Sequence, residues 1–205
     1  MADTQAPRSP AASARAATWA DANALSRTLG RAFHDDPFIA CLFRDAASRP
    51  GKLPKLFHLL FKLALPLGGC LVTSDCEAVA LWRPPGQAEL HWGHYIANAL
   101  PFIDIFGLDI PHVLRTMDLV DRQHPHAPHW YLQVLGTEPA RQGRGYAGLL
   151  MRKQLAVVDA DGLPAYLETA KAANIPIYGA FGFEVTGEVV VPGGVTSYSM
   201  WRPAR

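Results

Sequence analysis

Apolar and polar residues recur along this chain with two periods, which together predict the order of its helices and strands. Residues spaced about 3.6 apart indicate one face of a helix, whereas strict alternation indicates a strand. In the first part the pattern predicts a strand at 15–18, helices at 19–35, 51–65, 89–106 and 111–122, and a hairpin of strands at 69–73 and 78–82. From Trp130 onwards it predicts strands at 130–135, 165–168, 183–191 and 195–201, with helices at 145–159 and 175–181. This order is typical of an α/β domain built on a mixed sheet.

The domain boundaries follow from the segments whose apolar residues show neither the helical nor the strand pattern. Residues 1–14 contain Ala, Ser and Pro but no apolar run, so we expect a disordered tail rather than a signal peptide, followed by a single domain over 15–205. The apolar stretch at 53–72 is interrupted by Lys55, Lys62 and Pro66. A membrane-spanning helix needs about 20 consecutive apolar residues, so we expect no membrane partner.

Charge and cysteine content narrow the classes of function. Lys and Arg number 19 and Asp and Glu number 18, which gives a net charge of +1. The chain therefore lacks the positive field that nucleic-acid backbones require, and we expect no nucleic acid partner. The three cysteines form no CxxC pair, which disfavours a disulfide framework and fits a reducing cytoplasm. Because His124, His126 and His129 lack carboxylates or thiolates at a metal-binding spacing, we expect no metal.

The segment at 135–150 is a glycine-rich turn between a predicted strand and a predicted helix. The first N–H groups of a helix have no internal acceptor and lie at the positive end of its dipole, so such a turn suits an anionic ligand. Gly143 and Gly145 allow tight curvature and close approach of that ligand. A Walker loop is excluded because Tyr146 and Ala147 follow Gly145 where Lys and Ser or Thr would be needed. A dinucleotide fingerprint is disfavoured because the turn lies late in the chain.

Two motifs in this region resemble those of the GNAT superfamily of acyl-CoA N-acyltransferases. Residues 142–147, Gln-Gly-Arg-Gly-Tyr-Ala, are similar to the family pattern Gln/Arg-x-x-Gly-x-Gly/Ala. Downstream, the segment from Asn174 to Phe183 is similar to the family's Asn-x-x-x-Tyr helix and its Gly-Phe turn. The region from Trp130 to Trp201 looks most like the branch that includes puromycin N-acetyltransferase. The resemblance implies a mixed, mostly antiparallel central sheet, splayed between its fourth and fifth strands and flanked by helices.

The resemblance also implies that acetyl-CoA binds where those two strands separate. Leu135 and Thr137 would offer backbone groups to its pantetheine arm, and Asn174 would hold the same arm. The residues that would cradle the pyrophosphate are Gln142, Gly143, Arg144, Gly145, Tyr146 and Ala147. Gly136 falls where the family's fourth strand carries a bulge, and a glycine suits both a bulge and close ligand approach.

For the chemistry, the resemblance implies direct attack of a neutral amine on the thioester, with no acyl-enzyme. Tyr178 matches the tyrosine that protonates the departing thiolate, since a phenol with a pKa of about 10 keeps its proton at neutral pH. Glu168, at the end of its predicted strand, is placed to face the gap and accept the amine's proton. Glu168 could equally be an exposed strand-end carboxylate, and Tyr178 could be a helix aromatic residue packed under the sheet. A backbone N–H near Leu135 is the expected oxyanion donor.

The acceptor implied is a primary amine of a small molecule. Phe33, Asp35, Asp36 and Trp82 are the candidates to contact it. The two aspartates would attract a cationic amine, although they also suit a solvated helix end before Pro37. Aromatic residues such as Trp82 are more often part of a core. Two other functions remain open: a domain that binds CoA without catalysis, and an acyltransferase for a peptide or protein amine. A homodimer is left open as well.

Overall fold

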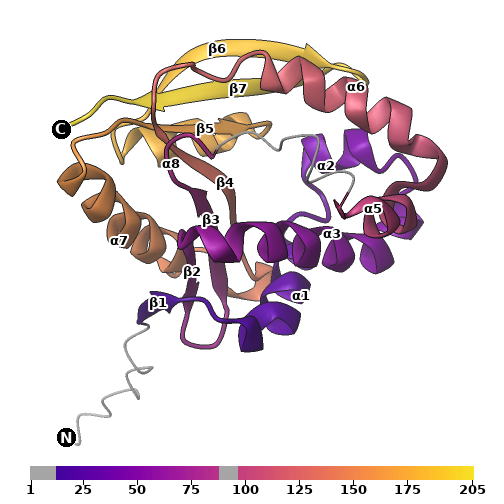
Figure 1. Cartoon of the computed structure of the whole chain (residues 1–205), viewed down its shortest axis with the longest axis horizontal. Coiled ribbons are helices and arrows are strands. Elements are labelled where there is room, and N and C mark those ends of the chain that lie inside the picture. The colour runs from indigo at the N-terminus through magenta and orange to yellow at the C-terminus, as the bar shows by residue number, and fades with distance from the viewer. Residues whose placement is uncertain (1–12, 88–96) are drawn as a thin grey trace, which may run out of the picture.

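The computed structural model describes residues 13–87 and 97–205, which form one sheet with helices on both faces (Figure 1). Residues 1–12 of the predicted tail and residues 89–96 of a predicted helix lie outside the described residues. The strands are β1 (Ala14–Ala16), β2 (Cys70–Thr73), β3 (Ala78–Arg83), β4 (Trp130–Thr137), β5 (Ala165–Thr169), β6 (Glu184–Val191) and β7 (Val195–Arg202). Ala14 pairs with Thr73, so the sheet begins one residue before the predicted domain boundary.

The helices confirm the predicted α/β pattern, with one addition. Their bounds are α1 (Ala22–Ala32), α2 (Pro37–Leu42), α3 (Arg49–Ala64), α5 (Ala99–Phe106), α6 (Ile110–Asp121), α7 (Tyr146–Ala160) and α8 (Ile175–Gly179). In Figure 1, α7 lies on one side of the sheet while α1 and α3 lie on the other. Two hydrophobic clusters fill the spaces between the sheet and these helices, so each face of the sheet has its own core.

The additional helix, α2, begins where the sequence pattern predicts the end of the first helix. Asp36 is its N-cap, and Oδ1 of Asp36 accepts hydrogen bonds from the N–H groups of Phe38 at 3.0 Å and Ile39 at 3.2 Å. Pro37 occupies the first helical position, where its missing N–H costs nothing. An aspartate followed by proline therefore begins a helix here.

The strand order is β1-β2-β3-β4-β5-β7-β6, and all neighbouring strands are antiparallel except β4 and β5. These two parallel strands pair over three residues of each, from Trp130 to Leu132 of β4. Beyond that point β4 continues to Thr137 alongside β3, and β5 continues to Thr169 alongside β7. The predicted splay between the fourth and fifth strands is confirmed, and it opens a gap at their carboxyl ends.

β4 contains the predicted bulge, but the position predicted for it, Gly136, was wrong. Gly136 pairs regularly with Val79, whereas Gln133 is the extra residue between the partners of Leu81 and Trp82. A bulge shifts the alternation of side chains along a strand. Leu132 consequently packs in the core beneath α7, while Val134 packs in the core beneath α1 and α3.

Gly136 serves the packing of α1 against β4. A Cβ at this position would lie 2.7 Å from Cδ2 of Leu29, which is fully buried, and 3.0 Å from Cε2 of Phe33. We expect Gly136→Ala to lower the free energy of unfolding by about 1–3 kcal/mol, the usual cost of overpacking a core. Urea denaturation measures this change. The matched variant is Gly51→Ala in α3, where an added Cβ meets open space, and it should stabilise the protein by up to about 1 kcal/mol. Equal effects of the two variants would contradict this explanation.

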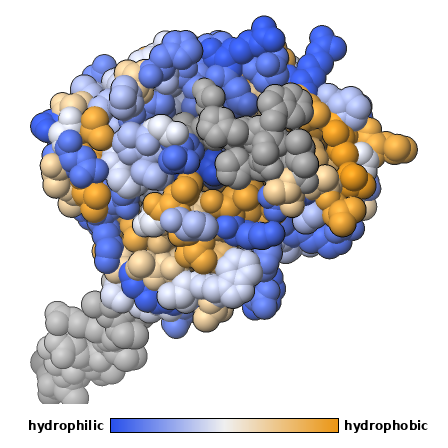
Figure 2. All heavy atoms as spheres, viewed as in Figure 1, coloured by the Kyte–Doolittle hydropathy of each residue, from blue (hydrophilic) through white to orange (hydrophobic). Residues whose placement is uncertain are grey.

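The described helices and surface show two further features. Within residues 13–87 and 97–205, no helix is long and apolar enough to cross a membrane. Figure 2 shows apolar side chains gathered on the side of the molecule where α5 lies. The exposed ones there include Leu100, Ile103 and Leu108.

Candidate functional site

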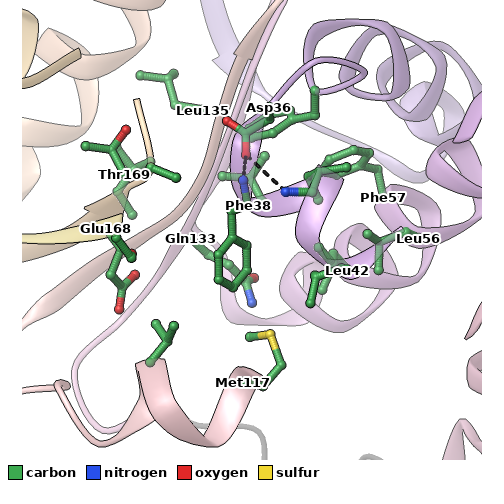
Figure 3. Close-up of a pocket in the computed structure, with 18 of the residues that line it drawn as sticks. Asp36, Phe38, Leu42, Leu56, Phe57, Met117, Gln133, Leu135, Glu168 and Thr169 are labelled. Carbon is green, nitrogen blue, oxygen red and sulfur yellow. Dashed lines mark hydrogen bonds between the residues drawn. The ribbon is translucent and has the colours of Figure 1, made fainter. Parts of the chain in front are cut away.

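A cavity of about 250 Å³ lies between the sheet and the helices that cover one of its faces. Its lining includes residues 131–135 of β4 and 168–170 at the end of β5, the two edges of the gap. Phe33 directly after α1, Phe57 of α3 and Met117 of α6 line it from the helical side. Figure 3 shows Glu168 and Thr169 on one side of the cavity and Leu56 and Phe57 on the other. The strand gap and the cavity are therefore continuous parts of one site.

Glu168 lies in this cavity and contacts His124 of the loop between α6 and β4. Their Nε2 and Oε1 atoms are 2.7 Å apart, and only 7% of the His124 side chain and 11% of the Glu168 side chain are exposed. Glu168 is therefore a largely buried carboxylate in a pocket, and the alternative of an exposed strand-end carboxylate is wrong. A carboxylate beside an imidazole is an arrangement that can accept a proton and pass it on.

Aromatic residues surround this pair, and their side chains stay uncharged at neutral pH. The ring of His124 makes edge contacts with Tyr131 at 4.7 Å and Tyr166 at 4.8 Å between centroids. Burial, together with the negative charge of Glu168, raises the pKa of Tyr131 well above its usual value, and the same causes raise that of Tyr166. Burial also lowers the pKa of His129, so this imidazole is held in its neutral form. Glu168 is thus the group placed to exchange a proton with a ligand in the cavity, and His124 lies next to it.

Tyr178, on α8, lines the same cavity from beyond the end of β5. It is buried, and its ring packs edge-on against Phe183 with centroids 6.2 Å apart. Burial, and to a smaller degree the charge of Asp36, raises the pKa of Tyr178 to about 12. Its phenol therefore remains a proton donor throughout the neutral and mildly alkaline range.

The glycine-rich loop before α7 has the backbone shape that the sequence predicts. Gly143 and Gly145 adopt left-handed φ values of 74° and 82°, and Gly145 caps the N-terminus of α7. Among the described residues, nothing lies within 4 Å of a Cβ built at either glycine. The exposed Arg144 stands between them. The first N–H groups of this 15-residue helix have no intrahelical acceptor, so the loop can hold a phosphate.

The other residues predicted to contact acetyl-CoA flank this loop or the gap. Gln142 donates from Nε2 to the carbonyl oxygen of Thr137 at 3.4 Å, which links the loop to the end of β4. Asn174 donates from Nδ2 to Oγ1 of Thr169 at 3.3 Å, and Leu135 lines the cavity. Tyr146 and Ala147 form the first turn of α7. The geometry thus places the predicted residues around the gap, with Leu135 and the loop before α7 on the β4 edge and Asn174 on the β5 edge.

The four candidates for acceptor contact divide into two pairs. Phe33 and Asp36 line the cavity, and burial raises the pKa of Asp36. Asp35 lies outside the lining: its side chain is 90% exposed and its carboxylate contacts His34 at 2.9 Å. Trp82 is fully buried in the core beneath α7, on the opposite face of the sheet from the cavity. The expectation of a substrate contact is therefore corrected for Asp35 and Trp82.

Two residues at this site escaped the sequence reasoning: Gln133 lines the cavity, and His124 contacts Glu168. His124 lies in a loop of histidines and prolines without periodicity, and only the folded chain brings it to Glu168. Gln133 is the bulged residue of β4, and its Oε1 atom is buried with no hydrogen-bond partner among the described residues. Figure 3 shows the Gln133 side chain inside the cavity. A buried acceptor of this kind requires a donor, which a bound ligand can supply.

Several known proteins are similar to this chain. Residues 127–186 match the family model described as "Acetyltransferase (GNAT) domain". "Uncharacterized N-acetyltransferase C550.08" of Schizosaccharomyces pombe is 27% identical over 176 residues, which is 80% of this chain and 70% of that protein. A solved structure of "histone acetyltransferase HPA2 and related acetyltransferase" from Corynebacterium glutamicum has a TM-score of 0.73 and 27% identity, and the match covers 95% of this chain and 97% of that one. Arylalkylamine N-acetyltransferase 2 from Aedes aegypti shares the fold, with a TM-score of 0.66, 16% identity and coverage of 96% and 100%.

Proposed function

Since this chain is an N-acetyltransferase of the GNAT superfamily, we propose that it transfers the acetyl group of acetyl-CoA directly to a primary amine of a small molecule. The observation that carries this proposal is the gap between β4 and β5, which leads into a cavity holding both Glu168 and Tyr178. The gap itself would hold the acyl donor, and the cavity behind it would hold the acceptor. Proximity of two bound reactants supplies much of the rate enhancement in a reaction of this type.

The described residues fit acetyl-CoA. The N-terminal turn of α7, with Gly143, Arg144 and Gly145, would hold the pyrophosphate through backbone N–H groups and one positive charge. Leu135, Gly136 and Thr137 at the end of β4 would lie along the pantetheine arm, opposite Asn174. An added Cβ finds open space at both loop glycines, so the loop leaves room for close approach.

In the proposed reaction, the amine nitrogen bonds to the thioester carbonyl carbon, the C–S bond breaks, and sulfur leaves as a thiolate. Glu168 accepts the proton that the amine loses, and its contact with His124 gives that proton a route away from the cavity. Tyr178 donates its phenolic proton to the leaving sulfur, and the phenolate that results regains a proton from water. The surroundings of the two groups differ: Glu168 lies beside the imidazole of His124, and burial raises the pKa of Tyr178 to about 12, which keeps its phenol protonated until the sulfur leaves.

A small molecule is the acceptor that the shape of the site favours. The cavity is bounded by α1, α2, α3, α5 and α6 as well as by the sheet, so its volume of about 250 Å³ suits a compact ligand. The Aedes aegypti protein with the same fold is named for arylalkylamines, which are small amines. The test is to incubate the protein with acetyl-CoA and a panel of primary amines and to measure free CoA and N-acetylated product by mass spectrometry. Equimolar formation of both supports the proposal, whereas acetylation of peptides alone would overturn the small-molecule assignment.

Replacing the proposed base should have a pH-dependent effect. We expect Glu168→Gln to lower kcat/KM about 100-fold at neutral pH, the lower end of the usual general-base contribution. The deficit should shrink as pH rises, because an increasing fraction of the amine is then already deprotonated in solution. The titratable groups around Glu168 include His124, His129, Tyr131 and Tyr166, and the charge of Asp121 acts on the two tyrosines. All of them are retained in the variant.

Steady-state rates measured from pH 6 to pH 10 check this prediction. Glu188→Gln is the matched control, since Glu188 is an exposed carboxylate on β6 and should behave like the native protein. If the pH–rate profile of Glu168→Gln runs parallel to that of the native protein, Glu168 takes no part in proton transfer.

A further inference from the structure

We propose that the acceptor is an amine with a single positive charge at one end and an uncharged, apolar body. An amine that carries a second cationic group at its other end would be a poor substrate. This inference rests on the proposed function and names the class of amine that the cavity accepts. It follows from how polar and apolar side chains are distributed over the walls of the cavity.

The helical walls of the cavity are apolar. Phe33 and Phe57 pack against each other with ring centroids 5.0 Å apart, and Phe102 and Phe106 do so at 4.7 Å. Leu56 and Leu60 of α3 lie on the same side. An aromatic or alkyl body packed against these side chains would gain hydrophobic free energy without losing a hydrogen bond.

The sheet wall carries the groups that would hold an ammonium ion. Glu168 provides a negative charge, and Oε1 of Gln133 is a buried acceptor with no hydrogen-bond partner among the described residues. Figure 3 shows Glu168 on the side of the cavity opposite Leu56 and Phe57, with Gln133 between them. Tyr178 lines the same cavity from α8. The amino group of a substrate is therefore directed toward the strand gap, and its body toward the helices.

A second cation has no counterpart at the helical end. Among the described lining residues, the carboxylates are Asp36 and Glu168. Oδ1 of Asp36 already accepts hydrogen bonds from the N–H groups of Phe38 and Ile39, and Oδ2 lies 4.0 Å from Nζ of Lys171. A diamine or a guanidinium-bearing amine would have to bury its distal charge against leucine and phenylalanine side chains, and an unpaired buried charge is strongly unfavourable.

The test compares amines of matched length on the native protein. We expect kcat/KM for hexylamine to exceed that for 1,6-diaminohexane by at least 100-fold, and that for 2-phenylethylamine to exceed that for agmatine by a similar factor. Acetyl-CoA binding is measured in parallel by calorimetry. Equal or faster acetylation of the dications would overturn this inference and leave the proposed function intact. Acetylation of neither class would overturn the proposed function, and this inference with it.

A charge placed on the helical wall provides a second test. Leu60 is a partly buried cavity residue of α3, and Leu60→Glu should raise kcat/KM for 1,6-diaminohexane relative to hexylamine at least tenfold. Leu108→Glu is the control, since Leu108 is fully exposed and lies outside the cavity. Its amine preference should equal that of the native protein. A folded Leu60→Glu protein with the native preference would contradict the proposed orientation of the substrate.

Discussion

Replacement of Tyr178 by phenylalanine is expected to lower kcat by about 100- to 10,000-fold, the range typical of a lost general acid. Phenylalanine keeps the ring and its packing against Phe183 but removes the only proton that the side chain can donate. The thiolate would then leave without protonation. The KM for acetyl-CoA should stay near its native value, because the lost interaction forms in the transition state rather than on binding.

The pH dependence of kcat in the native protein is a second test of Tyr178 as the general acid. Because burial raises the pKa of Tyr178 to about 12, this phenol stays protonated up to pH 10, and ionisation of Tyr178 should cause no fall in kcat between pH 7 and pH 10. Tyr198→Phe is the control, since Tyr198 lies on β7 outside the cavity. Rapid-mixing and steady-state rates for both variants provide the comparison. A Tyr178→Phe protein with native kcat would exclude Tyr178 as the acid.

Replacement of Gly145 by glutamate is expected to weaken acetyl-CoA binding at least about 100-fold. The glutamate would place a side chain and a negative charge at the N-terminus of α7, where the pyrophosphate is proposed to lie. Repulsion between like charges in a binding site costs several kcal/mol, and each 1.4 kcal/mol corresponds to about a tenfold change in Kd. Isothermal titration calorimetry measures the effect.

Gly162→Glu separates this effect from backbone strain. Gly162 follows the other end of α7 and also has a left-handed φ, of 63°, with nothing within 4 Å of an added Cβ among the described residues. Both variants therefore carry the same added charge and a comparable conformational cost. The Gly162→Glu protein should bind acetyl-CoA with native affinity. Similar losses in the two variants would indicate general destabilisation and contradict a phosphate site at Gly145.

The sequence predicts much of this fold because its helices and strands have strong hydrophobic periods. The pattern locates α1, α3, α6 and α7, and the two similar motifs place the gap between β4 and β5. It does not reveal that β7 lies between β5 and β6, because periodicity identifies a strand without identifying its neighbours. The helix α2 has only six residues, too few for a periodic signal, and its start is marked only by Asp36 and Pro37.

The site is less predictable because its residues come from distant segments. Glu168 and Tyr178 belong to recognisable motifs, whereas His124 reaches Glu168 only because the loop before β4 folds over the end of β5. Trp82 shares a face of β3 with Ala78 and Ala80, and only the packing of α7 shows that this face is a core. Gln133 enters the cavity through a bulge, a local irregularity that the alternation of side chains does not predict.

Hydrogen exchange measured by mass spectrometry with and without acetyl-CoA tests the location of the acyl-donor site most directly. Bound ligand protects the backbone amides that it covers or orders. Slower exchange is predicted in peptides covering 133–149 and 170–180, which include both edges of the gap and the loop before α7. The hairpin formed by β6 and β7 should exchange at the same rate in both conditions. Unchanged exchange at 133–149, or protection confined to the hairpin, would contradict acetyl-CoA binding between β4 and β5.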